Sequence, residues 1–330
     1  MKKSIYVFND GEFKRKDNTL YFETEQEKKY LPVEDVSAIY VFGEITLNKR
    51  FLEFISQKEI IIHFLNNYGY YTGSFYPREH LNSGYMTLKQ AEHYLDEKKR
   101  LDLASKFITG ATRNIEQILK YYQNRGKETE SYLKRIQTLT EKIPGCKSTN
   151  ELMAIEGNIR NAYYSAFNEI ITKKDFYFTS RTKRPPQDRL NALISYGNTM
   201  AYVIVLSEIY KTHLDPRIGF LHATNFRRFT LNLDIAEIFK PILVDRVIFY
   251  LLSKKMLRKP HFEKRTNSIF MNDKGRKIFI EEWEKRLQTT IKHQNLGRNV
   301  SYRRLIRMEL YKLEKHLIGE REYEPYISRW

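Results

Sequence analysis

PREHLNSGYMTLKQAEHYLDEKKRLDLASKF, residues 77–107, is the stretch in which the character of the chain changes. It opens with Pro, Asn, Ser and Gly, which are residue types that interrupt regular structure. From Met86 onward, apolar residues recur at helical spacing, as they do in an amphipathic helix. We therefore predict an N-terminal domain at residues 1–77, a linker at 78–85 and a C-terminal domain at 86–330.

The N-terminal part is typical of β-structure. Alternating or continuous apolar runs of strand length predict strands at Ser4–Phe8, Glu12–Lys16, Thr19–Glu23, Val36–Phe42, Ile60–Leu65 and Tyr70–Tyr76. Asn9-Asp10-Gly11 has the composition of a hairpin turn between the first two of these strands. One helix is expected at Asn48–Gln57. A small, mostly β domain follows from this pattern.

The C-terminal part is dominated by the 3.6-residue period. After a long helix that starts at Met86, we expect helices at 114–123, 130–142, 156–173, 188–212, 233–254, 275–287 and 301–317. A short hairpin is expected where Ser268–Met271 meets the turn residues 272–275. The fold class is therefore α+β, with a mostly β N-terminal domain and a larger all-α C-terminal domain.

Charge is distributed unevenly along the chain. Of 330 residues, 57 are Lys or Arg and 40 are Asp or Glu, a net charge of +17. Residues 1–85 contain 11 basic and 12 acidic side chains, so the remaining residues have a net charge of +18. A field of this size favours a polyanionic partner, most commonly nucleic acid, although an anionic membrane surface or solubility alone would also use it.

The sequence also limits the compartment. Cys146 is the single cysteine, so no disulfide within the chain and no four-thiolate zinc site can form. The N-terminus has the pattern of a strand and turn and lacks that of a signal peptide. No uncharged apolar run approaches the roughly 20 residues that span a bilayer. We expect a cytoplasmic protein without a membrane partner.

The best candidate site lies in residues 219–245, GFLHATNFRRFTLNLDIAEIFKPILVD. Asp234 and Glu237 are three residues apart and share a helix face, and His222 precedes Asp234 by twelve residues. One imidazole with carboxylate oxygens suits Mg²⁺ or Mn²⁺. The alternative is structural: a histidine near a turn, and an Asp that complements the dipole of a helix start. Nucleotide-binding, zinc-protease and serine-hydrolase motifs are absent from the sequence.

Two further segments offer charged side chains. Glu156 is expected at the start of an apolar helix, either as a partner of the helix dipole or as an inward carboxylate that meets His222 and Glu237. Arg181, Lys183 and Arg184 precede Pro185-Pro186 in a basic loop, of the kind that contacts phosphates or is merely solvated.

These segments together resemble the CRISPR-associated adaptation integrase, the first-numbered and near-universal Cas protein. The matching residues are Ala154–Asn158, Arg184–Asp188 with Asn191–Ser195, Leu214–His222, Leu233–Pro241, Tyr302–Arg307 and Tyr323–Tyr326. They keep the order and spacing of the family from the N-terminal part to the last residues. The resemblance implies a β-sandwich-like N-terminal domain that dimerises, a flexible connection and a helical catalytic domain.

The resemblance also implies a site. By motif, Glu156, His222 and Glu237 bind a divalent metal, with Glu at a position that is Asp in some members. Asp234 matches an auxiliary acidic position, and Lys240 matches a basic position expected to face DNA. We add Arg184, Arg227 and Arg228 as candidate DNA contacts; the last two lie where the sequence departs from the family pattern.

The implied activity is phosphoryl transfer with Mg²⁺ or Mn²⁺. The enzyme would join the 3′-hydroxyl of a pre-spacer DNA to the CRISPR repeat, and water in place of the hydroxyl would give endonuclease activity. Two homodimers would flank a dimer of the small second-numbered Cas protein in a heterohexamer. The alternatives are a metal-dependent nuclease that acts on branched or repair-intermediate DNA, and a non-enzymatic DNA-binding protein.

Overall fold

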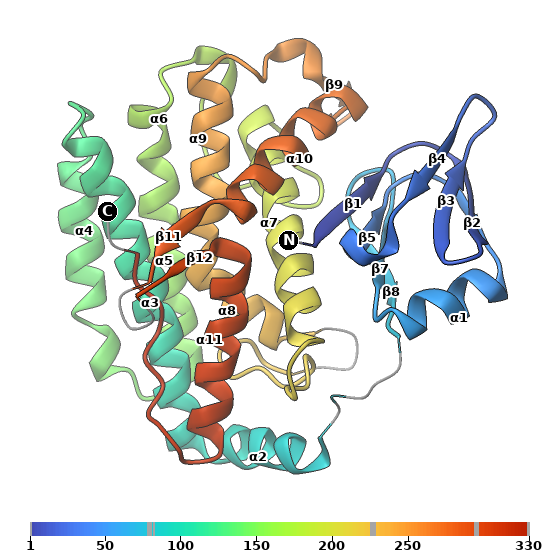
Figure 1. The fold of residues 1–330 in the computed structure, drawn as a ribbon. Coiled ribbons are helices and arrows are strands. Elements are labelled where there is room, and N and C mark those ends of the chain that lie inside the picture. Colours follow the sequence, from blue (N-terminus) through green and yellow to red (C-terminus); the bar gives the residue numbers. More distant parts are fainter. Residues whose placement is uncertain (1, 78–80, 82, 225–228, 294–296, 329–330) are drawn as a thin grey trace. The chain divides into compact units, whose positions relative to one another are not determined.

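The computed structural model describes residues 2–77, 81, 83–224, 229–293 and 297–328. The chain forms two compact units, Met1–Leu81 and Asn82–Trp330, and the division falls inside the range expected for the linker. The first unit is built mainly of strands and the second mainly of helices (Figure 1). The α+β fold class predicted from the sequence is confirmed.

One sheet of the N-terminal unit is mostly parallel. Its order is β1 (Lys3–Val7), β5 (Val36–Val41), β7 (Ile61–Leu65) and β8 (Tyr71–Phe75). The first three strands run parallel and only β8 is antiparallel to its neighbour. The continuous apolar runs of β5 and β7 are explained by their central positions, where both faces of the sheet are covered.

The second sheet has the order β4 (Lys28–Leu31), β3 (Thr19–Glu23), β2 (Gly11–Lys16) and β6 (Ile45–Leu47). Helix α1 (Lys49–Gln57) follows β6, and the side chain of its N-cap residue Asn48 accepts a hydrogen bond from Phe51 N. A short 3₁₀ turn covers Val33–Asp35. One hydrophobic cluster joins both sheets and α1; it includes Val7, Phe13, Leu20, Ile39, Phe51 and Ile62.

The expected hairpin at Asn9-Asp10-Gly11 is wrong. β1 belongs to the first sheet and β2 to the second, so this turn carries the chain from one sheet to the other. The amide of Gly11 donates to the carbonyl of Glu44, 3.0 Å away, and β2 pairs in parallel with β6 instead. The residues do form a turn, but long-range pairing gives the strand after it a different partner.

The C-terminal unit contains long helices and two small hairpins. Its helices are α2 (Gly84–Leu95), α3 (Glu97–Gln123), α4 (Glu130–Thr140), α5 (Thr149–Ser165), α6 (Phe167–Ile170), α7 (Arg189–Ile209), α8 (Leu231–Lys240), α9 (Arg246–Ser253), α10 (Asp273–Gln288) and α11 (Tyr302–Leu317). Short 3₁₀ turns cover Ile143–Gly145, Lys174–Phe176 and Lys259–His261.

Several expected helix boundaries differ; the helix expected at 156–173, for example, is formed by α5, which begins at Thr149, and the short α6. The long helix that starts near residue 86 breaks at Asp96, whose carboxylate accepts hydrogen bonds from Lys98 N and Lys99 N and begins α3. α3 then continues to Gln123 and absorbs the separate helix expected at 114–123. The helical spacing of apolar residues continues through Asp96 without interruption. The break is therefore set by the side chain of Asp96, which caps α3.

Helix α8 lies against α3 and α7 in the core of the unit. It passes through a π-helical turn, Pro241–Asp245, into α9, so the helix expected at 233–254 is formed by three consecutive segments. α7 is long and apolar enough to cross a membrane by length and composition. However, 78% of its apolar window is buried inside the protein, as in the core helix of a soluble protein.

The hairpin expected near 268–275 exists with a different turn. β10 (Ser268–Met271) pairs antiparallel with β9 (Phe262–Arg265), so its turn precedes β10. Asn272 instead accepts a hydrogen bond from Gly275 N and begins α10. A second hairpin, β11 (Thr290–Lys292) with β12 (Asn299–Ser301), has no counterpart among the elements expected from the sequence.

Candidate active site

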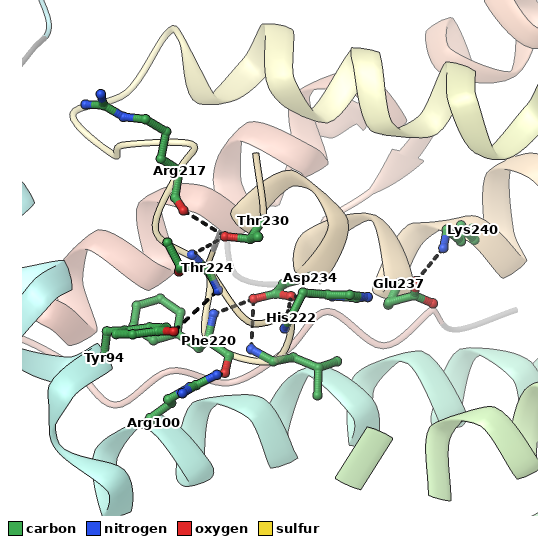
Figure 2. Close-up of polar contacts among 12 residues, drawn as sticks. Tyr94, Arg100, Arg217, Phe220, His222, Thr224, Thr230, Asp234, Glu237 and Lys240 are labelled. Atoms are coloured by element: carbon green, nitrogen blue, oxygen red, sulfur yellow. Dashed lines mark hydrogen bonds and ion pairs between the residues drawn. The ribbon is translucent and has the colours of Figure 1, made fainter. Parts of the chain in front are cut away.

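Asp234 organises the segment that precedes α8. Its Oδ2 accepts hydrogen bonds from Phe220 N at 2.5 Å and Leu221 N at 3.0 Å. Its Oδ1 accepts from His222 N at 3.0 Å and contacts His222 Nδ1 at 2.7 Å (Figure 2). The carboxylate is fully buried. It therefore fixes both the backbone that carries His222 and the orientation of its imidazole.

A glycine makes this arrangement possible. A Cβ atom at Gly219 would lie 2.7 Å from Asp234 Oδ2 and 2.9 Å from Leu231 N, closer than such contacts occur. Thr230 closes the same turn, because its hydroxyl accepts from Gly219 N and donates to the carbonyl of Arg217, both at 2.8 Å (Figure 2). Close backbone approach, and not an unusual φ angle, requires glycine here.

A second cluster joins α5 and α8. On α5, Nε of Arg160 donates to Glu156 Oε1 at 3.2 Å. Its Nη2 donates to Glu237 Oε2 on α8 and, at 3.2 Å, to the carbonyl of Glu237. The ammonium of Lys240 binds the other carboxylate oxygen of Glu237, and it also lies over the ring of Tyr202, 4.6 Å from the centroid. Glu156 and Glu237, which are far apart in the sequence, thus both pair with Arg160, and Glu237 also pairs with Lys240.

Burial sets the ionisation of these acids. Burial raises the pKa of Glu156, and the nearby charge of Glu237 raises it further. Burial also opposes ionisation of Glu237, but the charges of Lys240 and Arg160 outweigh it and hold the pKa of that carboxyl well below its usual range. One carboxylate of the pair is firmly ionised while its neighbour binds protons more readily.

His222 links the two clusters. Burial disfavours the imidazolium form, but the hydrogen bond and charge of Asp234, with the charge of Glu237, raise the pKa of His222 above its ordinary value. Its ring extends from Asp234 towards Glu237 (Figure 2). The ring nitrogen that Asp234 does not hold is therefore directed to the glutamate cluster.

Sequence reasoning missed two charged residues, Arg160 and Asp245. Asp245 ends the π-helical turn after α8 and is fully buried; burial raises its pKa to about 7. Arg160 and Asp245 interact electrostatically. The available signal was their charge inside apolar patterns: Arg160 follows Glu156 by one helical turn, and Asp245 follows the run Pro241–Val244.

The other predicted residues have different positions. Glu156 is in the middle of α5, where a dipole role is excluded, because the N-cap residue of that helix is Ser148. Lys240 is buried and ion-paired with Glu237; that it faces DNA stays a prediction. Arg184 is exposed in the loop before α7. Arg227 and Arg228 lie outside the described residues.

Lys183, in the basic loop, interacts electrostatically with the two glutamates. Its pKa is lowered, mainly by burial and further by the charges of Arg181 and Lys240, and the charges of Glu156 and Glu237 only partly oppose this shift. Arg181 points elsewhere: it donates to Asn191 and Ser195 on α7 at 2.8 and 2.9 Å.

The donor set fits a divalent cation by chemistry, since it combines carboxylates with an imidazole. The arrangement is nevertheless not that of a ready metal site. Within the described part of the chain, no three His, Cys, Asp or Glu side chains lie together so that they could hold a metal ion. Arg160 and Lys240 instead neutralise the glutamates.

Comparison with known proteins identifies the family. The protein-family model described as CRISPR associated protein Cas1 matches residues 5–285 of this chain. The chain belongs to the Cas1 family. CRISPR-associated endonuclease Cas1 2 of Thermodesulfovibrio yellowstonii is 61% identical over 330 residues, covering 100% of both chains. The family resemblance predicted from the motifs is confirmed.

Several solved structures share the fold of this chain. A Cas1 protein from Thermotoga maritima has a TM-score of 0.88 and 47% identity, covering 98% of this chain and 99% of that one. A casposase bound to an integration product has a TM-score of 0.87 and 20% identity, with 99% and 96% covered. A chain of a Cas6-RT-Cas1–Cas2 complex has a TM-score of 0.86 and 16% identity, with 100% and 36% covered. The last two likenesses show the fold alone.

Proposed function

We propose that the chain is a metal-dependent DNA endonuclease and integrase of CRISPR spacer acquisition, which joins the 3′-hydroxyl of a pre-spacer to CRISPR repeat DNA. The observation that carries the proposal is the convergence of Glu156 and Glu237, from helices far apart in sequence, beside an imidazole held by Asp234. Family membership and relatives named as endonucleases support the same activity.

The residues divide the work as follows. Glu156, Glu237 and His222 would hold a Mg²⁺ or Mn²⁺ ion, which when bound polarises the target phosphate and stabilises the charge of the transition state. Asp234 keeps His222 Nδ1 occupied and directs the other ring nitrogen to the site. The oxygen of the 3′-hydroxyl would form a new P–O bond to a repeat phosphate as the bond between that phosphate and its 3′-oxygen breaks. The attacking hydroxyl gives its proton to solvent, and the departing 3′-oxygen takes one up as a free 3′-hydroxyl. Water in place of that hydroxyl gives strand cleavage.

DNA is the partner that the charge of the helical unit favours. A group of positive charges lies around the end of α9, where exposed Lys255 and Arg258 interact with Lys173, and Arg258 and Lys274 both act on His261. Burial lowers the pKa of Lys173, and the charges of Lys255 and Arg258 lower it further. A phosphate backbone would relieve this mutual repulsion.

The assembly is also part of the proposal. One fold neighbour comes from a Cas6-RT-Cas1–Cas2 complex, and another is a casposase bound to an integration product. We propose that two homodimers of this chain flank a dimer of Cas2 on the pre-spacer. The N-terminal unit, which is nearly neutral by sequence, would form the dimer contact.

The experiment supplies a duplex with 3′-hydroxyl ends and a supercoiled plasmid that contains the repeat array, with Mg²⁺ or Mn²⁺. Covalent joining by the wild type supports integration; cleavage without joining would refute it and favour a nuclease of branched or repair DNA. Glu156→Gln and Glu237→Gln should each lose at least about a hundredfold in rate with little change in DNA affinity. Glu263→Gln removes an exposed acid from β9 and should behave as wild type. Unchanged rates in the first two variants would show that these glutamates do not carry the activity, and no joining or cleavage by the wild type would leave only a DNA-binding role.

A further inference from the structure

Arg160 occupies the position between the two glutamates that the proposed function assigns to a metal. Its guanidinium binds Glu156 through Nε and Glu237 through Nη2, and Lys240 binds the remaining oxygen of Glu237. Both carboxylate oxygens of Glu237 are therefore engaged by side-chain cations. A divalent ion that uses Glu237 as a ligand would meet these two cations at short range and be repelled by their charges.

The guanidinium has an unused donor. Nη1 of Arg160 is buried without a hydrogen-bond partner among the described residues, although an unsatisfied charged donor in the interior is costly. Arg160 itself is only 8% exposed, so bulk water does not compensate for the missing contact. The other hydrogen bonds of Arg160 hold the guanidinium in place, and an additional acceptor for Nη1 would stabilise it further.

An acidic acceptor lies nearby. Both carboxylate oxygens of Asp245 are buried and lack a hydrogen bond of good geometry in the part of the chain that the structure describes, although the hydroxyl of Tyr163 interacts with them. Arg160 and Asp245 interact through their charges, and Asp245 is 1% exposed. The guanidinium of Arg160 and the carboxylate of Asp245 are therefore both buried, and each has atoms that could form a further hydrogen bond.

We propose that Arg160 is a place-holding cation for the metal, and that its guanidinium moves from Glu156 and Glu237 to Asp245 when a divalent cation binds the glutamates. The inference rests on the proposed function, because it takes these glutamates as metal ligands. It accounts for the absence of a ready three-ligand group among the described residues. Asp245 would then be a positioning residue, whose carboxylate accepts hydrogen bonds from the displaced guanidinium of Arg160.

Charge balance supports the exchange. Without metal, two carboxylates left unpaired in the interior would repel each other, and Arg160 and Lys240 remove that repulsion. With metal, the ion neutralises the glutamates and Arg160 would be in excess unless it found another carboxylate. Asp245 is the buried carboxylate with which the displaced guanidinium can pair. The exchange therefore leaves neither the glutamates nor Arg160 without a partner of opposite charge.

The test measures Mn²⁺ binding to the full-length protein without DNA, by the loss of the free-ion signal in electron paramagnetic resonance. Arg160→Gln removes the competitor and should lower the Mn²⁺ dissociation constant at least about tenfold, on the scale of changes to residues that support metal ligands. Arg160→Lys keeps the charge without the fork that bridges both carboxylates, so it should give a smaller decrease.

Asp245→Asn removes the acceptor and should raise the dissociation constant about tenfold in the wild-type background. In the Arg160→Gln background the same change should have less than about a twofold effect, because no guanidinium then needs a new partner. An equal effect in both backgrounds would show that Asp245 acts only through its general charge, and would overturn its assigned role.

Arg307→Gln is the matched control, because Arg307 also pairs with a buried glutamate, Glu208, away from the site. It should lower the melting temperature without altering Mn²⁺ affinity. Unchanged or weaker Mn²⁺ binding by both Arg160 variants would overturn the inference. Failure of the proposed function has a different signature: Glu237→Gln would then bind Mn²⁺ as the wild type does.

Discussion

Replacing Asp234 with Asn tests the physical account of how His222 is held. Asp234 offers four hydrogen-bond acceptances: Oδ2 serves the amides of Phe220 and Leu221, and Oδ1 serves the amide and Nδ1 of His222. The amide of Asn can accept with only one atom. Whichever way it is oriented, its NH₂ group faces donors that the carboxylate satisfied.

The magnitude follows from the two bonds lost. Hydrogen bonds to a charged group contribute about 1.5–3 kcal/mol each, so two of them give a loss on the order of 3–6 kcal/mol before the site relaxes. We expect about 3 kcal/mol after relaxation, which corresponds to a fall of roughly 10 °C in the melting temperature of a unit of this size. The rate should fall about a hundredfold or more, because His222 loses the partner that fixes its tautomer.

The assay combines thermal unfolding with cleavage of a DNA duplex under single-turnover conditions. Asp215→Asn is the control: Asp215 accepts from Arg217 N at 2.9 Å and pairs with that exposed side chain, so its change should be below about 1 kcal/mol. If Asp234→Asn melts within about 1 °C of the wild type and keeps its cleavage rate, the account of Asp234 as the organiser of this segment is refuted.

Three further predictions concern other parts of the helical unit. Gly219→Ala should lower the melting temperature and the cleavage rate together, because its Cβ would press on Asp234; a variant as stable as the wild type would contradict the close approach. The pKa of buried Glu208 is lowered, since Lys211 and Arg307 outweigh its burial. Its contribution to stability is therefore complete above the ordinary value of 4.5 and is lost as the pH falls through the folded-state pKa. The difference in unfolding free energy between the wild type and Glu208→Gln should accordingly shrink in acid, and a constant difference would contradict this sign. Arg258→Gln should weaken DNA binding for every sequence and reduce the slope of log affinity against log salt by about 1, as measured by fluorescence anisotropy; an unchanged slope would exclude a phosphate contact there.

Much of the fold could be predicted from the sequence because it depends on local periodicity. The change from strand to helix near residue 80, the central strands β5 and β7, and the core helix α7 all follow from the spacing of apolar side chains. The errors arose where distant segments compete. The turn at Asn9–Gly11 joins two sheets because Gly11 finds its partner in Glu44, and no local pattern contains that choice.

The sequence by itself determined which side chains we propose to carry the chemistry. Polar side chains stand out in apolar segments at Glu156, His222, Asp234 and Glu237. The family motifs, which occur in the expected order, assign each of these residues a proposed role. Only the tertiary structure decided how they are connected: Asp234 binds the backbone before its own helix, and Arg160 bridges α5 to α8. Ion pairs between residues far apart in the chain depend on which helix faces pack together. Spacing along one segment does not encode that packing.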